Sequence, residues 1–130
     1  MRRRLLLAKI HRAVVTEANL DYVGSLTLDQ ALMDAAGLRP YEQIDVYNVT
    51  RGTRLTTYLI PGAAGEGDCC INGAAAHLCE RGDRVIICAF ADLDEQELDA
   101  HRPRVVLVHD DNTLYQVKDE EQPHTHFAAS

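Results

Sequence analysis

The shortness of its apolar segments constrains the fold of this chain more than any other feature, because turn residues interrupt them at brief intervals. Segments rich in β-branched and aliphatic residues predict strands over 5–15, 42–50, 53–60, 69–71, 84–91, 104–109 and 113–117. The Arg51-Gly52 turn joins two of these segments in a hairpin, and 62–67 is expected to form a flexible loop. Such a pattern is typical of a small β-barrel or an α+β domain.

Only short helices are expected between these strands. Thr27 and Gln30 have the spacing of a capping box, and Gly37 is placed to end the helix that would follow. Asn72 is a candidate N-cap for a second short helix over 73–78. Together with the strands, these signals predict a mainly β fold.

The chain has 130 residues and no internal repeat or linker, so a single domain over residues 1–130 is expected. The acidic segment 92–99 predicts one or two exposed helical turns, and the polar tail 118–130 is expected to fray. A formal net charge of -7 argues against a protein that binds nucleic acid.

The basic start of the chain resembles a signal peptide only superficially. Its apolar stretch is interrupted almost at once by Lys9, His11 and Arg12, and no small-residue cleavage site follows. No apolar run approaches the ~20 residues that a membrane helix needs. A cytoplasmic protein with no membrane partner is therefore expected.

Four cysteines lie in the second half of the chain: Cys69, Cys70, Cys79 and Cys88. Their spacing matches neither a disulfide framework nor paired metal ligands. Adjacent Cys69 and Cys70 in an extended segment would face opposite sides. Buried reduced thiols are expected, and a metal site that includes His77, or one made by His124 and His126, is the less favoured alternative.

The pair Gly24-Ser25 offers a specific chemistry, and Ser25 is one of only two serines, the other being Ser130. A serine hydroxyl can attack the carbonyl carbon of the preceding residue and convert the peptide bond into an ester. Glycine at that preceding position permits the strained backbone that the attack needs. Elimination then frees the upstream chain and leaves dehydroalanine, which hydrolyses to a pyruvoyl group. An ordinary turn serine is the alternative.

Other polar positions could serve the same chemistry. Lys9 lies on the first predicted strand, and Arg54 and Tyr58 share one face of the second hairpin strand. Thr57 falls on the opposite face unless a bulge rotates it. The segment 72–76 is either a capped helix start or an anion-binding turn with free amides. Each position alone also fits an ordinary surface or core role.

Four stretches in combination are similar to the bacterial aspartate 1-decarboxylase family. They are KIHRAVVTEANLDYVGS (9–25), IDVYNVTRGTRLTTY (44–58), INGAAAH (71–77) and GDRVII (82–87). The resemblance implies a small double-psi β-barrel with short helices and a homotetramer with active sites between subunits. It also implies autocatalytic cleavage between Gly24 and Ser25, giving a β chain of residues 1–24 and an α chain of residues 25–130.

The resemblance further implies what each residue does. Ser25 would become a covalent pyruvoyl cofactor that forms a Schiff base with L-aspartate, Tyr58 would donate the proton, and Thr57 would assist self-cleavage. The implied substrate-binding residues are Lys9, Arg54, Thr57, Asn72, Gly73, Ala74 and Ala75. The implied reaction gives β-alanine and CO2 without a metal and supplies pantothenate biosynthesis. A maturation factor that promotes cleavage is left open.

Two other classes of protein stay open from the residues. One is a non-catalytic barrel of the same fold that never cleaves and acts as a binding or assembly module. The other is a serine hydrolase that uses Ser25 with His11 or His77 as the base, although the chain lacks a G-x-S-x-G elbow.

Overall fold

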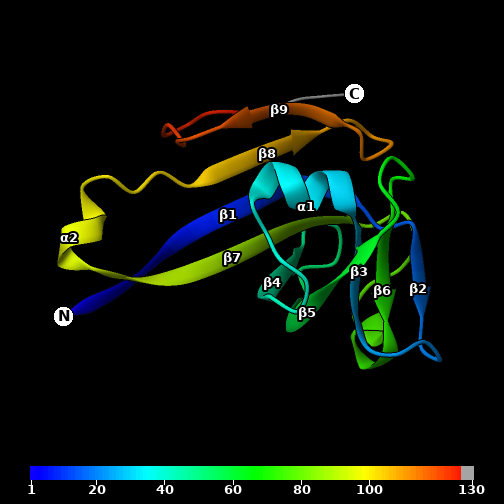
Figure 1. The fold of residues 1–130 in the computed structure, drawn as a ribbon. Helices are drawn as coiled ribbons and strands as arrows, with labels where there is room; N and C mark the ends of the chain where they lie inside the picture. The colour runs from blue at the N-terminus through cyan, green and yellow to red at the C-terminus, as the bar shows by residue number, and fades with distance from the viewer. Residues whose placement is uncertain (127–130) are drawn as a thin grey trace.

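Nine strands form one mixed sheet in the computed structural model, which describes residues 1–126 (Figure 1). Their bounds are β1 Arg2–Val14, β2 Glu17–Asn19, β3 Ser25–Asp29, β4 Gln43–Asn48, β5 Arg54–Gly62, β6 Cys69–Asn72, β7 Arg84–Asp94, β8 Arg104–Val108 and β9 Leu114–Lys118. Their order in the sheet is β2-β6-β3-β5-β4-β7-β1-β8-β9. The prediction of a mainly β fold with short helices is confirmed.

Three parallel pairings join strands that lie far apart in the sequence: β1 with β8, β2 with β6, and β3 with β5. Parallel neighbours need a crossover connection, so the chain passes over the sheet instead of running as a simple meander. Figure 1 shows β2, β3 and β6 at one end, and β1 and β7 running together to the N-terminus and α2 at the other. This crossed arrangement fits the small barrel that the resemblance implies.

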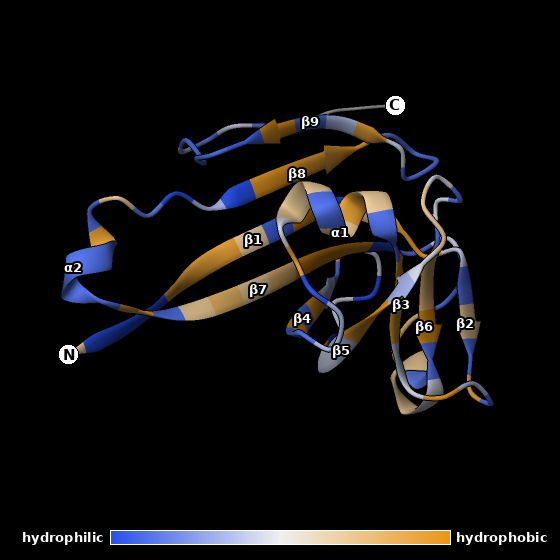
Figure 2. Ribbon diagram, viewed as in Figure 1, coloured by the Kyte–Doolittle hydropathy of each residue, from blue (hydrophilic) through white to orange (hydrophobic). Residues whose placement is uncertain are grey.

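The core lies inside this curved sheet, where alternate side chains of each strand point inward. Figure 2 shows the hydrophobic residues along β1, β7 and β6. Ile10, Leu26, Ile71 and Ile87 are completely buried there. The helix α1 (Gln30–Ala36) buries Leu32 and Met33 against the same core and contacts β8.

The predicted capping box is wrong, although the helix and its Gly37 terminus are confirmed. Thr27 lies within β3, which pairs with β6 as far as Leu28 and with β5 as far as Asp29. Ladder hydrogen bonds on both edges therefore extend the strand past the predicted cap. Asp29 is the N-cap instead, accepting a hydrogen bond from the Ala31 amide at 2.8 Å, and Gly37 ends the helix with φ 71°.

Asp29 also holds the loop that follows β5. Its buried carboxylate accepts hydrogen bonds from the backbone amides of Gly65 and Gly67, at 3.0 and 2.8 Å. The loop predicted over 62–67 is present, and its amides are tied to the start of α1. One side chain thus joins β3, α1 and this loop.

Two further boundaries differ from prediction. The segment 73–77 forms a 3₁₀ helix, η1 (Gly73–His77), and the Asn72 side chain makes no cap hydrogen bond to it. Residues 92–94 continue β7 because they pair with the N-terminal residues of β1, so only α2 (Glu95–Leu98) is helical in the acidic segment. Residues 119–126 form no regular element, and 127–130 lie outside the described residues. Within the described residues, no helix is both long and apolar enough to cross a membrane.

Candidate active site

A cleft of about 330 Å³ opens where β3 begins, beside the Gly24-Ser25 bond. The start of β3, the middle of β5 and the junction of β6 with η1 form its wall. Residues from these segments line it: Gly24, Ser25, Thr56, Thr57, Tyr58, Asn72, Ala74, Ala75 and Leu78. The structure thus brings together most of the site residues predicted from the sequence, and adds Thr56 and Leu78.

Ser25 has an unusual backbone and an unusual environment. Its φ of 144° lies in the region that favours glycine, and its side chain is 1% exposed. Among the described residues, its Oγ has no hydrogen-bond partner. Buried hydroxyls are nearly always paired, so a strained and unsatisfied serine in a cleft indicates a functional position.

Gly73, the first residue of η1, lies close to Gly24. Its φ is 62°, and a Cβ built on it would lie 2.7 Å from the Gly24 Cα and 3.1 Å from the Gly24 nitrogen. Both the conformation and the space therefore require glycine at this position. The prediction that Gly73 belongs to the site is supported by this backbone contact, which brings the two glycines together.

Three consecutive residues of β5 reach the cleft, although neighbours on a strand normally face opposite sides. β5 pairs with β4 over residues 54–58, but it pairs with β3 only from Leu59 onward. The edge of β5 toward β3 is therefore open at Thr57 and Tyr58, which explains how both line the cleft. Thr57 thus reaches the site with no bulge in the β4–β5 pairing.

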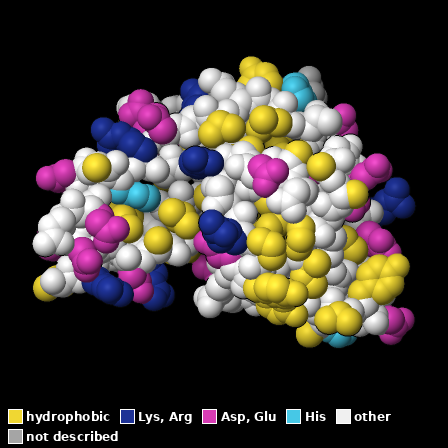
Figure 3. Space-filling model, viewed as in Figure 1, with side chains coloured by type: hydrophobic (Ala, Val, Ile, Leu, Met, Phe, Trp, Pro, Cys, Tyr) yellow, Lys and Arg dark blue, Asp and Glu magenta, His cyan; other side chains and the backbone are white. Residues whose placement is uncertain are grey.

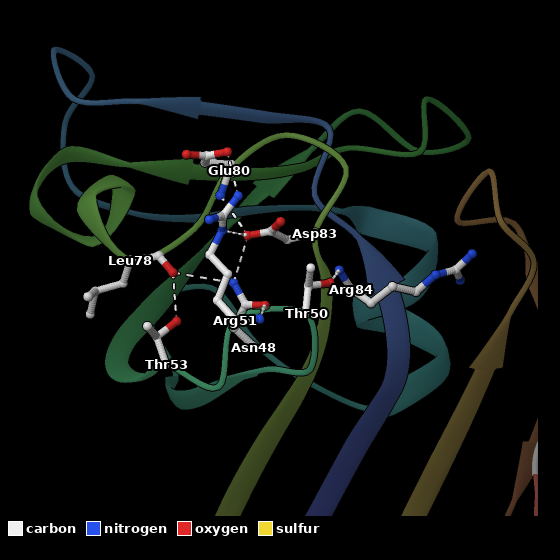
Figure 4. Close-up of polar contacts among 8 residues, drawn as sticks. All are labelled: Asn48, Thr50, Arg51, Thr53, Leu78, Glu80, Asp83 and Arg84. Carbon is white, nitrogen blue, oxygen red and sulfur yellow. Dashed lines mark hydrogen bonds and ion pairs between the residues drawn. The ribbon is translucent and has the colours of Figure 1, made fainter.

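A polar network behind the cleft holds the end of η1 (Figure 4). The Leu78 carbonyl accepts hydrogen bonds from Thr53 Oγ1 at 2.7 Å and from Asn48 Nδ2 at 3.3 Å. Asn48 also donates to Asp83 at 2.8 Å, and Arg51 Nε donates to the same carboxylate oxygen at 2.7 Å. This network fixes the position of Leu78 in the cleft wall.

Asp83→Asn should lower the free energy of unfolding at neutral pH by about 2 kcal/mol, because Arg51 loses its carboxylate partner. Burial raises the pKa of Asp83, but hydrogen bonds from Asn48, the Glu80 amide and Arg51 outweigh it and leave that pKa below 3.8. Its stabilisation is therefore full above that value and is lost as the pH falls through the lower folded value. Urea titrations across acid pH should show a larger loss of stability in the wild type than in Asp83→Asn. Equal acid sensitivity in both proteins would contradict the assignment.

Three predicted substrate-binding residues do not line this cleft: Gly73, whose backbone lies against Gly24, and the two cations Lys9 and Arg54. Lys9 Nζ pairs with Glu121 of the C-terminal segment at 2.8 Å, and the Lys9 side chain is 15% exposed. The Arg54 guanidinium carbon lies 4.5 Å from the centroid of the Tyr47 ring, a cation–π contact. One copy of the chain therefore does not place either cation beside Ser25.

The hydrolase alternative lacks its base at this position. In the part of the chain that the structure describes, neither His11 nor His77 lines the cleft. Burial, together with the charges of Lys9 and Arg12, lowers the pKa of His11 to about 4, so this imidazole is neutral near pH 7. These observations leave Ser25 without an adjacent imidazole.

All four cysteines are free and buried, as predicted. Burial raises the pKa of Cys69 to about 12, which keeps this thiol protonated. Residues 1–126 contain no cluster of three or more histidine, cysteine or acidic side chains able to hold a metal ion.

Fold and site together define a small, mainly β domain whose cleft is built around a strained serine. The family model for aspartate decarboxylase matches residues 1–115. The chain therefore belongs to the aspartate decarboxylase family, which confirms the resemblance.

Relatives named aspartate 1-decarboxylase match most of the chain. The protein of Syntrophobacter fumaroxidans is 56% identical over 112 residues, which cover 86% of this chain and 90% of that protein. The protein of Alkalilimnicola ehrlichii is 53% identical over 114 residues, or 88% of this chain and 90% of that protein. The protein of Neisseria meningitidis is 50% identical over 125 residues, or 96% of this chain and 98% of that protein.

Proposed function

We propose that this chain removes the α-carboxylate of L-aspartate to give β-alanine and CO2, using a pyruvoyl group that it makes from Ser25. The single observation that carries the proposal is the buried Ser25 Oγ, which has no partner among the described residues and follows Gly24 with a strained φ of 144°. The relatives named aspartate 1-decarboxylase support the substrate.

Self-cleavage at the cleft is proposed to proceed in successive chemical steps. Ser25 Oγ attacks the Gly24 carbonyl carbon, the peptide C–N bond breaks, and an ester forms. Loss of the Ser25 α-proton then expels the Gly24 carboxylate and leaves dehydroalanine, whose hydrolysis releases ammonia. The Thr57 hydroxyl, which lines the same cleft, assists this step as a hydrogen-bonding group. The products are residues 1–24 and residues 25–130.

A pyruvoyl group at position 25 supplies the electron sink that decarboxylation of an amino acid needs. Tyr58, which lines the cleft and is 37% exposed, delivers a proton to the former α-carbon. Asn72, Ala74 and Ala75, which line the cleft, and Gly73 between them bind the substrate. No further cofactor or metal enters the proposal.

Lys9 and Arg54 reach the cleft from a neighbouring subunit of a homotetramer in this proposal. Their absence from the cleft of a single chain supports the arrangement. Figure 3 shows hydrophobic side chains gathered at the end of the molecule that carries β3, β5 and β6. Tyr22, Val23 and Tyr41 are exposed large apolar residues, a feature typical of interfaces. A substrate carboxylate at Lys9 would replace Glu121.

Incubation of the purified protein with L-aspartate tests the proposal. Chromatography should show β-alanine with release of one CO2 for each aspartate consumed, whereas D-aspartate should not react. Phenylhydrazine, which attacks carbonyl groups, should abolish the activity, and serine-directed phosphonylating reagents should not. Inhibition by the phosphonylating reagent alone would favour the hydrolase.

Tyr58→Phe should leave self-cleavage intact and lower kcat by about 100-fold or more, because only the proton-donating hydroxyl is lost. Steady-state kinetics on protein whose processing is verified by mass measures this effect. Tyr41→Phe is the matched control, since the Tyr41 ring lies 6.4 Å from the Tyr58 ring but does not line the Ser25 cleft. An unchanged kcat in Tyr58→Phe would remove Tyr58 from this role.

Arg54→Ala should raise the KM for L-aspartate by about 100-fold, because the guanidinium no longer holds a substrate carboxylate. Mixed tetramers of Arg54→Ala and Tyr58→Phe should then regain part of the activity, since some interfaces combine an intact Arg54 with an intact Tyr58. Co-expression with two different affinity tags isolates such mixtures. Activity no higher than that of either variant alone would contradict the shared site.

The biological setting proposed is the cytoplasm, where β-alanine would supply pantothenate biosynthesis. Four free, buried cysteines fit a reducing compartment. A separate maturation factor for the Gly24-Ser25 cleavage is compatible with the buried position of Ser25.

A further inference from the structure

The side chains next to Ser25 form an ordered polar patch on the β3–β6 ladder. In this antiparallel pair, Ser25 lies opposite Asn72 and Thr27 lies opposite Cys70. Side chains two residues apart on a strand share a face, and directly opposed residues share it across strands. The four polar side chains are therefore neighbours on one face of the sheet. We call this set the Ser25 patch; its members are Ser25, Thr27, Cys70 and Asn72.

Within the Ser25 patch, the Asn72 carboxamide is held at both of its ends. Its Nδ2 donates to Thr27 Oγ1 at 3.0 Å, and its Oδ1 accepts from Cys70 Sγ at 2.9 Å. The other acceptor near this thiol, the Glu17 carboxylate, lies farther from the sulfur, at 3.8 Å. Asn72 is 4% exposed and Cys70 is 7% exposed, so water does not compete strongly for these bonds. Among the described residues, the amide nitrogen makes no other hydrogen bond.

The identities of the two partners favour one orientation of the carboxamide. A thiol donates a hydrogen bond but accepts one poorly, whereas a hydroxyl accepts well. Burial and the nearby Glu17 carboxylate raise the pKa of Cys70 to about 11, which keeps its S–H as a donor. Rotating the amide by half a turn would place an N–H group against the sulfur and lose a good hydrogen bond.

We infer that Thr27 and Cys70 are positioning residues that hold the Asn72 carboxamide in one orientation beside Ser25. The inference rests on the proposed function, because it assigns the fixed amide to the decarboxylation site. One amide hydrogen is bound to Thr27, and the second is available to an oxygen atom in the cleft. The two positioning residues act only through Asn72 and touch no reacting atom.

Kinetics on matched variants test this role. Cys70→Ala and Thr27→Val should each lower kcat by about tenfold with a smaller change in KM, which corresponds to the loss of one hydrogen bond. Cys70→Ser and Thr27→Ser keep a donor and an acceptor, and should stay within about twofold of wild type. Cys69→Ala is the control, since it removes a buried thiol from the adjacent position of β6. A Cys69→Ala enzyme with the same kcat as Cys70→Ala would overturn the inference.

A measurement without turnover separates this inference from the proposed function. In the Ser25→Ala protein, the two side-chain amide hydrogens of Asn72 give a pair of NMR signals. These signals are assigned by adding the change Asn72→Asp, which removes them. Thr27→Val and Cys70→Ala should shift this pair, and Cys69→Ala should not. Unmoved signals in both variants would overturn the positioning role whatever the activity. If the signals shift but the wild-type protein does not decarboxylate aspartate, the proposed function is rejected. The positioning role of Thr27 and Cys70 is then retained.

Discussion

Ser25→Ala should give an uncleaved chain with no decarboxylase activity. This is the largest effect expected from the removal of a single heavy atom in this protein. The change removes only Oγ, the group proposed to attack the Gly24 carbonyl carbon. Because this hydroxyl is buried without a partner in the described residues, its removal should leave the free energy of unfolding unchanged or raise it by about 1 kcal/mol. Intact-mass analysis and urea titration measure the two effects separately.

Thr56→Ala provides the control for Ser25→Ala. Thr56 lines the same cleft, but its hydroxyl donates to Asp45 at 2.7 Å and lies on β5 instead of beside Gly24. Removal of this second hydroxyl should leave self-cleavage intact. Cleavage of the Ser25→Ala chain at the same bond would show that another group makes the attack.

Gly73→Ala should also abolish self-cleavage, although no reacting atom is removed. The new Cβ would lie 2.7 Å from the Gly24 Cα, so the backbone at Gly24 must move away from residue 73. An alanine at φ 62° adds about 1–2 kcal/mol of backbone strain. Processing measured on a denaturing gel should be lost, and the urea midpoint should fall.

Gly52→Ala is the control that separates the backbone strain of an alanine at positive φ from the displacement of Gly24. Gly52 has a φ of 77°, but no atom lies within 4 Å of a Cβ built there. This variant should lose about 1–2 kcal/mol of stability and still cleave at Gly24-Ser25. If Gly73→Ala processes as well as Gly52→Ala, the close approach of the two glycines is irrelevant to self-cleavage.

Local patterns predicted the elements whose partners are near in sequence. The hairpin of β4 and β5 follows from the Arg51-Gly52 turn, and the end of α1 follows from Gly37. Thr27 was misassigned because β3 pairs with β5 and β6, both distant in sequence, and a capping pattern carries no information about such pairing. Tertiary contacts outweighed a local preference at that position.

Most of the residues that line the cleft were named from the sequence, but their geometry was not. The unpartnered Ser25 hydroxyl, the contact of Gly73 with Gly24 and the bonds of Asn72 all depend on the register of β3 with β6. No residue type or spacing encodes that register. The sequence also grouped Lys9 with Ser25, whereas a single chain pairs Lys9 with Glu121.

Intact-mass analysis of the purified wild-type chain, run under denaturing conditions, is the most direct test of self-cleavage at Gly24-Ser25. Two chains are expected, one ending in the carboxylate of Gly24 and one beginning at position 25 with a pyruvoyl group that blocks Edman degradation. A single chain of 130 residues with an intact Gly24-Ser25 bond, in a preparation that decarboxylates L-aspartate, would contradict this expectation.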